Sequence, residues 1–245
     1  MKKVFTKIFG LILAMVLVVT ASGFENVSAA SDYEPYGYVR KVNDKTKTFI
    51  GEKGKIVAEC FCESFKLHGF KKGIKKINKA LKKIASAYDC SDLYENARIF
   101  AEESAESNVF YNTINADVTY CDQEYFSVTF LSQWYAGGVS NINLNGIVFD
   151  INTGKKVSVT KLTGKKWNDI KNMLVKKIVD SGEFEGMEDD VVETFRKELK
   201  ESDVPYYINS KGKVVMIIPE YTEPFYGGWY REYVLDEIPA IYEVQ

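Results

Sequence analysis

The stretch from residue 109 to residue 151 alternates with a period of two, and two short turns interrupt it. Such alternation is typical of strands whose side chains point to opposite faces of a sheet. The turns are Asp122-Gln123 and Gly137-Gly138, and connections this short join antiparallel neighbours. We therefore expect three consecutive antiparallel strands, over 109–121, 125–135 and 142–151.

Other segments have a helical period, with apolar residues every three or four positions. We predict helices over 70–86 and 93–106, around Trp167–Ile178 and around Val192–Leu199. Further strand-like runs occupy 55–67, 206–208, 214–218 and 230–235. Strands occur in clusters and helices in blocks, so we expect an α+β fold with a mainly antiparallel sheet. Its two closely packed subdomains would span 51–135 and 136–245.

The predicted helix over 70–86 carries a run of lysines around its apolar stripe. They are Lys71, Lys72, Lys75, Lys76, Lys79, Lys82 and Lys83. A run of this kind indicates a solvated helix face. A face that binds the cell wall or another polyanion is the alternative.

Residues 1–30 have the pattern of a secretory signal peptide. Lysines at the start precede an apolar run over 8–20, and the small residues Ser28-Ala29-Ala30 follow it. We expect cleavage before Ser31, a flexible segment over 31–50, and a secreted protein that could associate with the cell wall. An uncleaved anchor is the alternative. No later stretch approaches the roughly 20 apolar residues that a membrane span needs, so none is expected after cleavage.

The charge of the exported chain bears on its partners. Removing residues 1–30 deletes three lysines and Glu25, so the formal charge changes from −2 to −4. A mildly acidic protein is poorly suited to nucleic acid, whose phosphates attract basic proteins. The charge is compatible with a cationic partner.

Four cysteines remain in the exported chain: Cys60, Cys62, Cys90 and Cys121. An even number in an exported protein favours disulfides. Cys60 and Cys62 are two apart in a predicted strand and point to one face, where a bridge between them would be strained. We expect each to pair with Cys90 or Cys121, in either combination. One disulfide, free thiols and a metal site are the alternatives, and the spacing fits metal knuckles least.

Residues that could carry catalysis or bind a metal are few. His68 is the only histidine and has no nucleophile motif near it. Asp150-x-Asn152-x-Gly154 resembles a calcium loop, but Lys161 stands where the closing glutamate belongs, so a turn is favoured. Acidic residues over 183–190 could form a carboxylate pair, but an exposed helix N-terminus explains them better. We predict no catalytic residue, no metal and no cofactor.

Two aromatic–glycine segments, 133–138 and 221–230, are the strongest candidates for recognition. Trp and Tyr in turns bury large areas at low entropic cost, which suits a binding surface. The same side chains could instead fold back on the core. The candidate contact residues are Trp134, Tyr135, Tyr226 and Trp229.

These segments resemble the extracellular region of the anti-sigma-V factor RsiV, which binds lysozyme, and a non-catalytic region of some peptidoglycan deacetylases. The resemblance covers most of residues 50–240, including the helix that contains Asn78. The matching residues are Tyr135, Gly137, Gly138, Phe149, Asp150, Thr153, Gly154, Lys155, Tyr221, Phe225, Tyr226 and Gly228. Val139-Ser140 departs from the Ala-His that often follows the glycines. The membrane span, the sigma-binding segment and the deacetylase domain are missing, so sigma-factor regulation is not implied.

The sequence thus predicts a secreted, non-enzymatic binding protein of the cell envelope. Lysozyme or another extracellular protein is the expected partner, with peptidoglycan as a further candidate. A wall-glycan-binding module and a carboxylate-dependent wall hydrolase are the alternatives, and a structural envelope component is a third.

Overall fold

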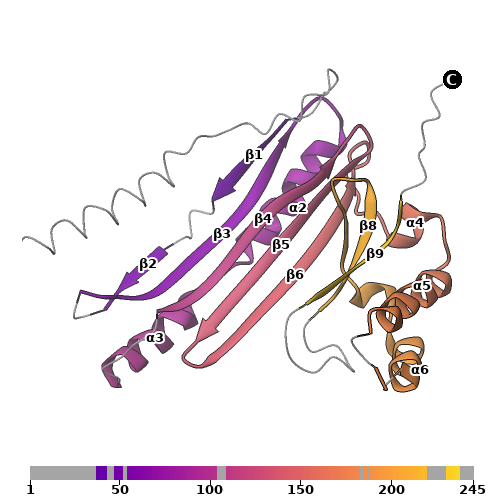
Figure 1. Cartoon of the computed structure of the whole chain (residues 1–245). Helices are drawn as coiled ribbons and strands as arrows, with labels where there is room; N and C mark the ends of the chain where they lie inside the picture. The colour runs from indigo at the N-terminus through magenta and orange to yellow at the C-terminus, as the bar shows by residue number, and fades with distance from the viewer. Residues whose placement is uncertain are drawn as a thin grey trace, which may run out of the picture. The chain divides into compact units, whose positions relative to one another are not determined.

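The computed structural model describes residues 37–42, 47–51, 54–103, 109–182, 185–186, 188–219 and 230–237 (Figure 1). The predicted signal peptide over 1–30 lies outside these ranges. Residues Pro35–Gln245 form one compact unit. Within the described ranges, no helix is both long and apolar enough to cross a lipid bilayer.

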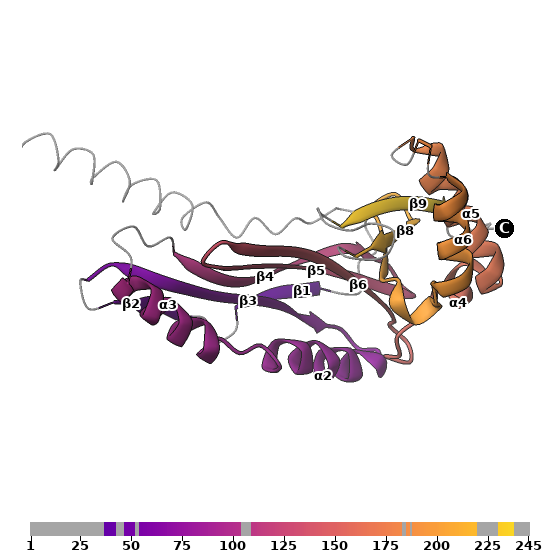
Figure 2. The ribbon, with the colours of Figure 1, turned by 90° about the horizontal axis from the view of Figure 1, so that it is seen from below.

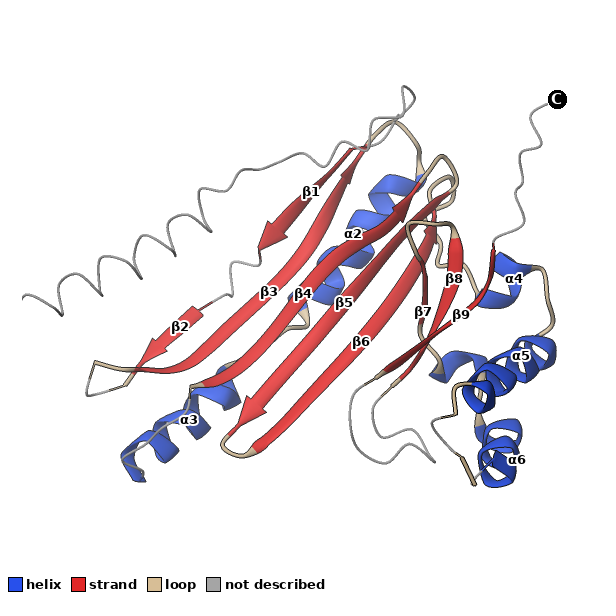
Figure 3. Cartoon of the chain, viewed as in Figure 1, coloured by secondary structure: helices blue, strands red, loops and turns tan. Residues whose placement is uncertain are grey.

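A six-stranded sheet forms the centre of the unit (Figure 3). Its strand order is β1-β3-β4-β5-β6. Strand β2 also pairs with β3, along the first half of that strand, whereas β1 pairs with the second half. The strands are β1 (Gly37–Val42), β2 (Lys47–Ile50), β3 (Ile56–His68), β4 (Phe110–Cys121), β5 (Tyr125–Ala136) and β6 (Val139–Asp150).

A second sheet of three strands has the order β7-β8-β9 and is antiparallel throughout. It consists of β7 (Tyr206–Ile208), β8 (Lys213–Ile218) and β9 (Arg231–Glu237). The helices between β6 and β7 are α4 (Val159–Thr163), α5 (Trp167–Asp180), α6 (Glu188–Glu198) and the 3₁₀ turn η1 (Glu201–Asp203). The predicted α+β class with a mainly antiparallel sheet is confirmed.

One strand pair is parallel, which the sequence analysis did not foresee. β3 and β4 run in the same direction, with Ala58 opposite Phe110 and Cys62 opposite Ile114. Parallel neighbours need a crossover connection, and here helices α2 (Gly73–Ser86) and α3 (Ser91–Glu103) supply it. Figure 2 shows both helices on one face of the large sheet, with β8 and β9 on the other.

Three segments differ from what the sequence predicted. Strands β1 and β2 fall inside the segment 31–50 that was expected to be flexible, because both pair with the long strand β3. Helix α4 is too short to show a helical period. The expected subdomain boundary at residues 135 and 136 falls in the β5–β6 hairpin, so the large sheet continues across it.

The large sheet has a hydrophobic core on each face. On the α2 side, Ile74, Ile77 and Leu81 pack against Phe126, Phe130 and other sheet residues. On the other face, Val148 packs with residues of α5, α6 and β8. Close packing there depends on Gly146, because a Cβ at this position would lie 2.4 Å from the carbonyl oxygen of Tyr206.

The cysteine pairing is only partly as predicted. Cys60 forms a disulfide with Cys90, with their Cα atoms 6.3 Å apart, and this links β3 to the start of α3. Among the described residues this is the one disulfide, and Cys62 and Cys121 lie outside it. The second predicted disulfide would have to join Cys62 to Cys121, and this prediction is wrong. Cys62 is opposite Ile114 on β4. Cys121 is seven residues further along β4, about 20 Å away, and a disulfide needs Cα atoms within about 7 Å.

Candidate functional site

The tip of the β5–β6 hairpin and the strand beside it form a cluster of aromatic side chains, which we call the aromatic end. It consists of Phe100, Phe110, Tyr111, Trp134 and Tyr135. The rings of Tyr111 and Tyr135 are stacked with their centroids 5.6 Å apart, and Phe110 meets Tyr135 edge-on at 5.9 Å. Phe100 of α3 lies 5.5 Å from Phe110. Rings in contact at these distances stiffen the surface they form.

The two candidate residues in this segment lie on opposite faces of the sheet. Successive side chains of a strand alternate between faces. Trp134 is opposite Asn112 and so shares the helix-covered face with Phe110 and Phe130. Tyr135 alternates with Trp134 and stacks on Tyr111, and its ring also meets Phe110 edge-on. The aromatic end therefore offers Trp134, not the pair, to a ligand on the helix side.

Trp134 is 37% exposed, although it lies in a paired strand, two residues before the end of β5. The residues directly beside it across the sheet are Asn112 on β4 and Asn141 on β6. Within the described part of the chain, the side-chain amides of these two residues form no hydrogen bond. An indole flanked by two available amides is a surface that can stack on a ligand and fix its orientation.

Exposed apolar side chains extend the aromatic end onto α3. Ile99 is 46% exposed and Phe100 47% exposed, and Val109 at the start of β4 is also exposed. A Cβ at Gly137 in the hairpin turn would lie 2.9 Å from the ring of Phe110, so this turn packs directly against the cluster. The apolar area is therefore continuous from α3 to the hairpin tip, which is unusual for a surface without a partner.

The structure describes the residues on either side of the second aromatic–glycine segment, but of the segment itself only Tyr230. β8 ends at Ile218 and β9 begins at Arg231, and these two residues are paired. Tyr226 and Trp229 lie between them, outside the described residues. Their role as contact residues stays a prediction.

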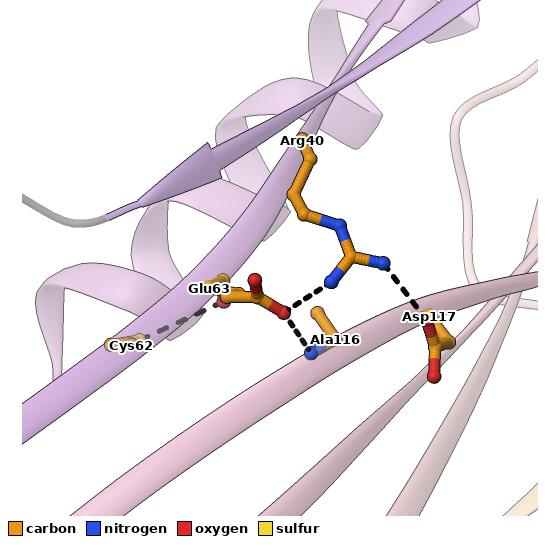
Figure 4. A network of polar contacts seen from close by, with 5 residues as sticks. All are labelled: Arg40, Cys62, Glu63, Ala116 and Asp117. Carbon is orange, nitrogen blue, oxygen red and sulfur yellow. Dashed lines mark hydrogen bonds and ion pairs between the residues drawn. The ribbon is translucent and has the colours of Figure 1, made fainter. Parts of the chain in front are cut away.

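A buried carboxylate lies at a different place in the sheet (Figure 4). Glu63 on β3 accepts a hydrogen bond from Arg40 on β1, with Nη1 and Oε2 2.7 Å apart. The same carboxylate oxygen accepts the backbone N–H of Ala116 on β4 at 3.1 Å. Arg40 also contacts Asp117, with Nη2 and Oδ1 3.0 Å apart, and lies over the ring of Phe65.

This network occupies the point where β3 changes partners. Pairing with β4 ends at Cys62, while pairing with β1 begins at Glu63. Four consecutive residues, Cys62–Phe65, are buried there, which breaks the two-residue alternation. Beyond Cys62 the backbone of β3 no longer pairs with β4. The Glu63 carboxylate accepts the Ala116 N–H there instead.

The electrostatics of the network favour an ion pair. Burial by itself lowers the pKa of Arg40, but the hydrogen bond and charge of Glu63, together with Asp117, raise that pKa above its usual value. The Glu63 carboxylate is held in place by a charge-assisted hydrogen bond from the guanidinium and by a backbone N–H. This arrangement favours a structural role for Glu63 over proton transfer.

Other candidate chemistry from the sequence is explained by local structure. The Asp150 carboxylate accepts the N–H groups of Asn152 and Thr153 at 2.9 Å each, so it closes a turn. In the acidic stretch, Glu188 begins α6 and accepts the N–H of Gly186, which lowers the pKa of the carboxyl. His68 is the exposed last residue of β3. No group of residues suited to a metal occurs within the described ranges.

The sequence points to Trp134 but not to its polar neighbours or to Phe100. Asn112 and Asn141 are distant in sequence, and only the strand register places them on either side of Trp134. A possible signal was the polar side chains at positions whose alternation assigns them to the core-facing side. Asn141, Asn143 and Asn145 follow this pattern on β6.

Comparison with known proteins adds information on the fold. No family model matches the chain, and no curated protein does. A crystal structure of a DUF3298 family member from Bacteroides fragilis has a TM-score of 0.56 at 10% identity, covering 82% of this chain and 89% of that one. A DUF3298 family protein from Pseudomonas aeruginosa has a TM-score of 0.49 at 13% identity, covering 84% and 91%. In its fold, the chain is therefore similar to a structure of the DUF3298 family.

Proposed function

We propose that this chain is a secreted, non-enzymatic binding protein of the cell envelope and that the aromatic end is its contact surface. The observation that carries the proposal is that Trp134, Ile99 and Phe100 are all exposed at this end of the sheet, where the ring of Phe100 packs against Phe110. Partially exposed aromatics on a rigid framework are typical of the residues that dominate binding energy. The partner is an extracellular protein, and lysozyme is the first candidate because of the resemblance to RsiV.

The charge near the aromatic end suits a cationic partner. Helix α3, which carries Ile99 and Phe100, has four acidic residues and one arginine in its sequence. Asp92 and Glu95 are exposed there. Opposite charge speeds the encounter with a cationic protein more than it fixes the final affinity. We therefore expect a binding rate that falls with added salt and a complex that persists.

The test is a calorimetric titration of residues 31–245 with a c-type lysozyme at low and at physiological salt. Saturable binding at both salt concentrations is expected. Trp134→Ala and Phe100→Ala should each weaken it by about tenfold or more, as loss of a central aromatic contact does. Tyr226→Ala and Trp229→Ala test the second aromatic–glycine segment in the same assay.

Val234→Ala is the matched control, because Val234 is 42% exposed on β9 and does not belong to the aromatic end. Its affinity should equal that of the unmodified chain. Absence of heat with lysozyme removes this partner from the proposal. Binding that survives Trp134→Ala and Phe100→Ala unchanged contradicts the assignment of the surface.

A wall glycan is a second candidate ligand, favoured by the amides beside Trp134. Asn112 and Asn141 flank the indole, and sugars bind to proteins by stacking on an aromatic ring while amides bond their hydroxyls. Titration with soluble peptidoglycan fragments tests it. Asn112→Ala and Asn141→Ala should weaken glycan binding while leaving lysozyme binding within about threefold, since interface contacts outside the aromatic hot spot contribute little. Equal loss of both ligands would argue against a separate glycan site.

A further inference from the structure

Helix α2 and the residues before it form a strongly basic surface. Lysines 71, 72, 75, 76, 79, 82 and 83 are all exposed. No acidic residue occurs between Glu63 and Asp89, so nothing on this element offsets their charge. Lys75, Lys79 and Lys82 follow one another along one side of the helix, at intervals of four and three residues. We call the seven lysines the basic face.

The helix that carries most of the basic face packs closely against the large sheet. The opposite side of α2 is buried through Ile74, Ile77 and Leu81. Near the start of the helix, Gly73 lies against the turn after β6, and a Cβ on it would be 2.2 Å from the carbonyl oxygen of Ile151. That turn places the exposed Lys155 near α2, because Gly154 approaches Lys76. The positive charge therefore extends beyond the helix.

An acidic residue in the turn beside α2 is already engaged. Asp150, in the same turn, accepts N–H groups of Asn152 and Thr153, and its other oxygen is 3.9 Å from Nζ of Lys161. Lys71 reaches the neutral side chain of Asn152, with Nζ and Oδ1 2.6 Å apart. Its charge is thus still available to an anion.

A fully exposed phenylalanine adjoins the basic face. Phe70 precedes Lys71 in the turn between β3 and α2, and its side chain is fully exposed. Among the described residues, no other large apolar side chain is as exposed. Water contact over a whole phenyl ring is unfavourable, and the ring gains free energy when it enters an apolar phase. An ordinary solvated helix rich in lysine has no exposed aromatic ring of this kind beside it.

We propose that the basic face and Phe70 dock the protein on the surface of an anionic lipid bilayer. The lysines attract acidic headgroups, while the phenyl ring inserts at the level of the headgroups. A soluble anionic polymer accounts for the lysines but gives Phe70 nothing to enter. The inference is independent of the aromatic end, which lies on other elements.

The experiment is sedimentation with lipid vesicles, using residues 31–245 because the apolar run over 8–20 would itself bind lipid. Residues Pro35–Gln245 form one compact unit that contains all three hydrophobic clusters. Binding is expected to vesicles of phosphatidylcholine mixed with phosphatidylglycerol and not to phosphatidylcholine alone. Changing Lys75, Lys79 and Lys82 to Gln should lower partitioning by about a hundredfold. Phe70→Ser should lower it by about tenfold.

Two controls match these changes. Lys197, Lys200 and Lys211, all exposed and outside the basic face, are changed to Gln, and Val234→Ser alters an exposed apolar residue on β9. Both controls should bind vesicles as the unmodified chain does. Equal binding to neutral vesicles, or an equal loss in the controls, overturns the proposal. If Phe70→Ser binds normally while the lysine variant fails, the surface is a general polyanion site and the lipid assignment is wrong.

Discussion

The side chain of Asn78 on α2 forms two hydrogen bonds with the backbone of Leu67 on β3. Its Oδ1 accepts the Leu67 N–H and its Nδ2 donates to the Leu67 carbonyl, both at 2.8 Å. Leu67 lies beyond Cys62, where β3 no longer pairs with β4. The amide of Asn78 therefore replaces the backbone of the missing strand and fixes the helix to the sheet.

Changing Asn78 to Ala should lower the free energy of unfolding by about 2–3 kcal/mol. Both backbone groups of Leu67 would lose their partner in a half-buried position, at about 1–3 kcal/mol for each unsatisfied group. Urea denaturation followed by circular dichroism measures the change. Lys79→Ala, at the exposed neighbouring position, is the control and should alter stability by less than about 0.5 kcal/mol. Equal stability of the two variants would contradict the role given to Asn78.

Changing Arg40 to Ala should destabilise the protein more than changing Asp117 to Asn. Arg40 is the cation for Glu63, whose side chain is only 9% exposed, whereas that of Asp117 is 73% exposed. Removing the cation leaves a buried carboxylate without its partner, and we expect a loss of about 1–2 kcal/mol, reduced because Arg40 itself is half exposed. Asp117→Asn should cost less than about 0.5 kcal/mol. Thermal denaturation at low salt distinguishes them, and the reverse order would exclude this account of the network.

The sequence predicted most elements because their periods are long and regular. Strands β4, β5 and β6 and helices α2 and α5 were each identified within a few residues, since a buried face repeats over many positions. Strands β1 and β2 are only six and four residues long, and they form because β3 offers them an edge. A strand that forms only because another strand pairs with it leaves no pattern in its own sequence from which it could be predicted.

The candidate site was less predictable for a related reason. Trp134 could be singled out as an aromatic residue before two glycines, but its surroundings depend on strand register. Asn112 and Asn141 become its neighbours only once β4, β5 and β6 are aligned. The cysteine pairing failed on the same point. Cys60 and Cys62 point to one face, as predicted, but the parallel register carries Cys121 out of reach.

Gly146 should not tolerate a side chain, although it lies in a strand where Gly is normally unfavourable. A Cβ there would be 2.4 Å from the oxygen and 2.6 Å from the carbon of the Tyr206 carbonyl. Gly146→Ala should separate β7 from the large sheet and cost about 1–3 kcal/mol, measured by urea denaturation. Gly37→Ala is the matched control, because no atom lies within 4 Å of its added Cβ. A cost as small as that of the control would show that β7 does not pack as described.

The Cys60–Cys90 bridge should contribute about 3–4 kcal/mol, since it closes a loop with a sequence separation of 30 residues. Comparing the melting temperature with and without a reducing agent measures this contribution. Tryptic mapping without reduction identifies the bridge, because the three cysteine-containing peptides are 56–66, 84–98 and 99–155. We expect 56–66 joined to 84–98. A link to 99–155 in the folded protein would contradict the strand register.

Stability at high pH should depend on Tyr88, which packs beneath the disulfide region and donates its hydroxyl hydrogen to the carbonyl of Asn112. Burial raises the pKa of Tyr88 from its ordinary value of 10.0 to about 12. Because the folded state holds this proton more tightly than the unfolded state, the contribution of Tyr88 to the free energy of unfolding is complete below pH 10. It is lost as the pH rises from 10 to 12.

Urea denaturation across this range should show the free energy of unfolding falling more steeply for the unmodified chain than for Tyr88→Phe, which has no proton to lose. Tyr120→Phe provides a comparison, since burial also raises the pKa of Tyr120 to about 12 and its removal should flatten the fall as well. Identical slopes for the unmodified chain and Tyr88→Phe would mean that the hydroxyl of Tyr88 is solvated in the folded protein.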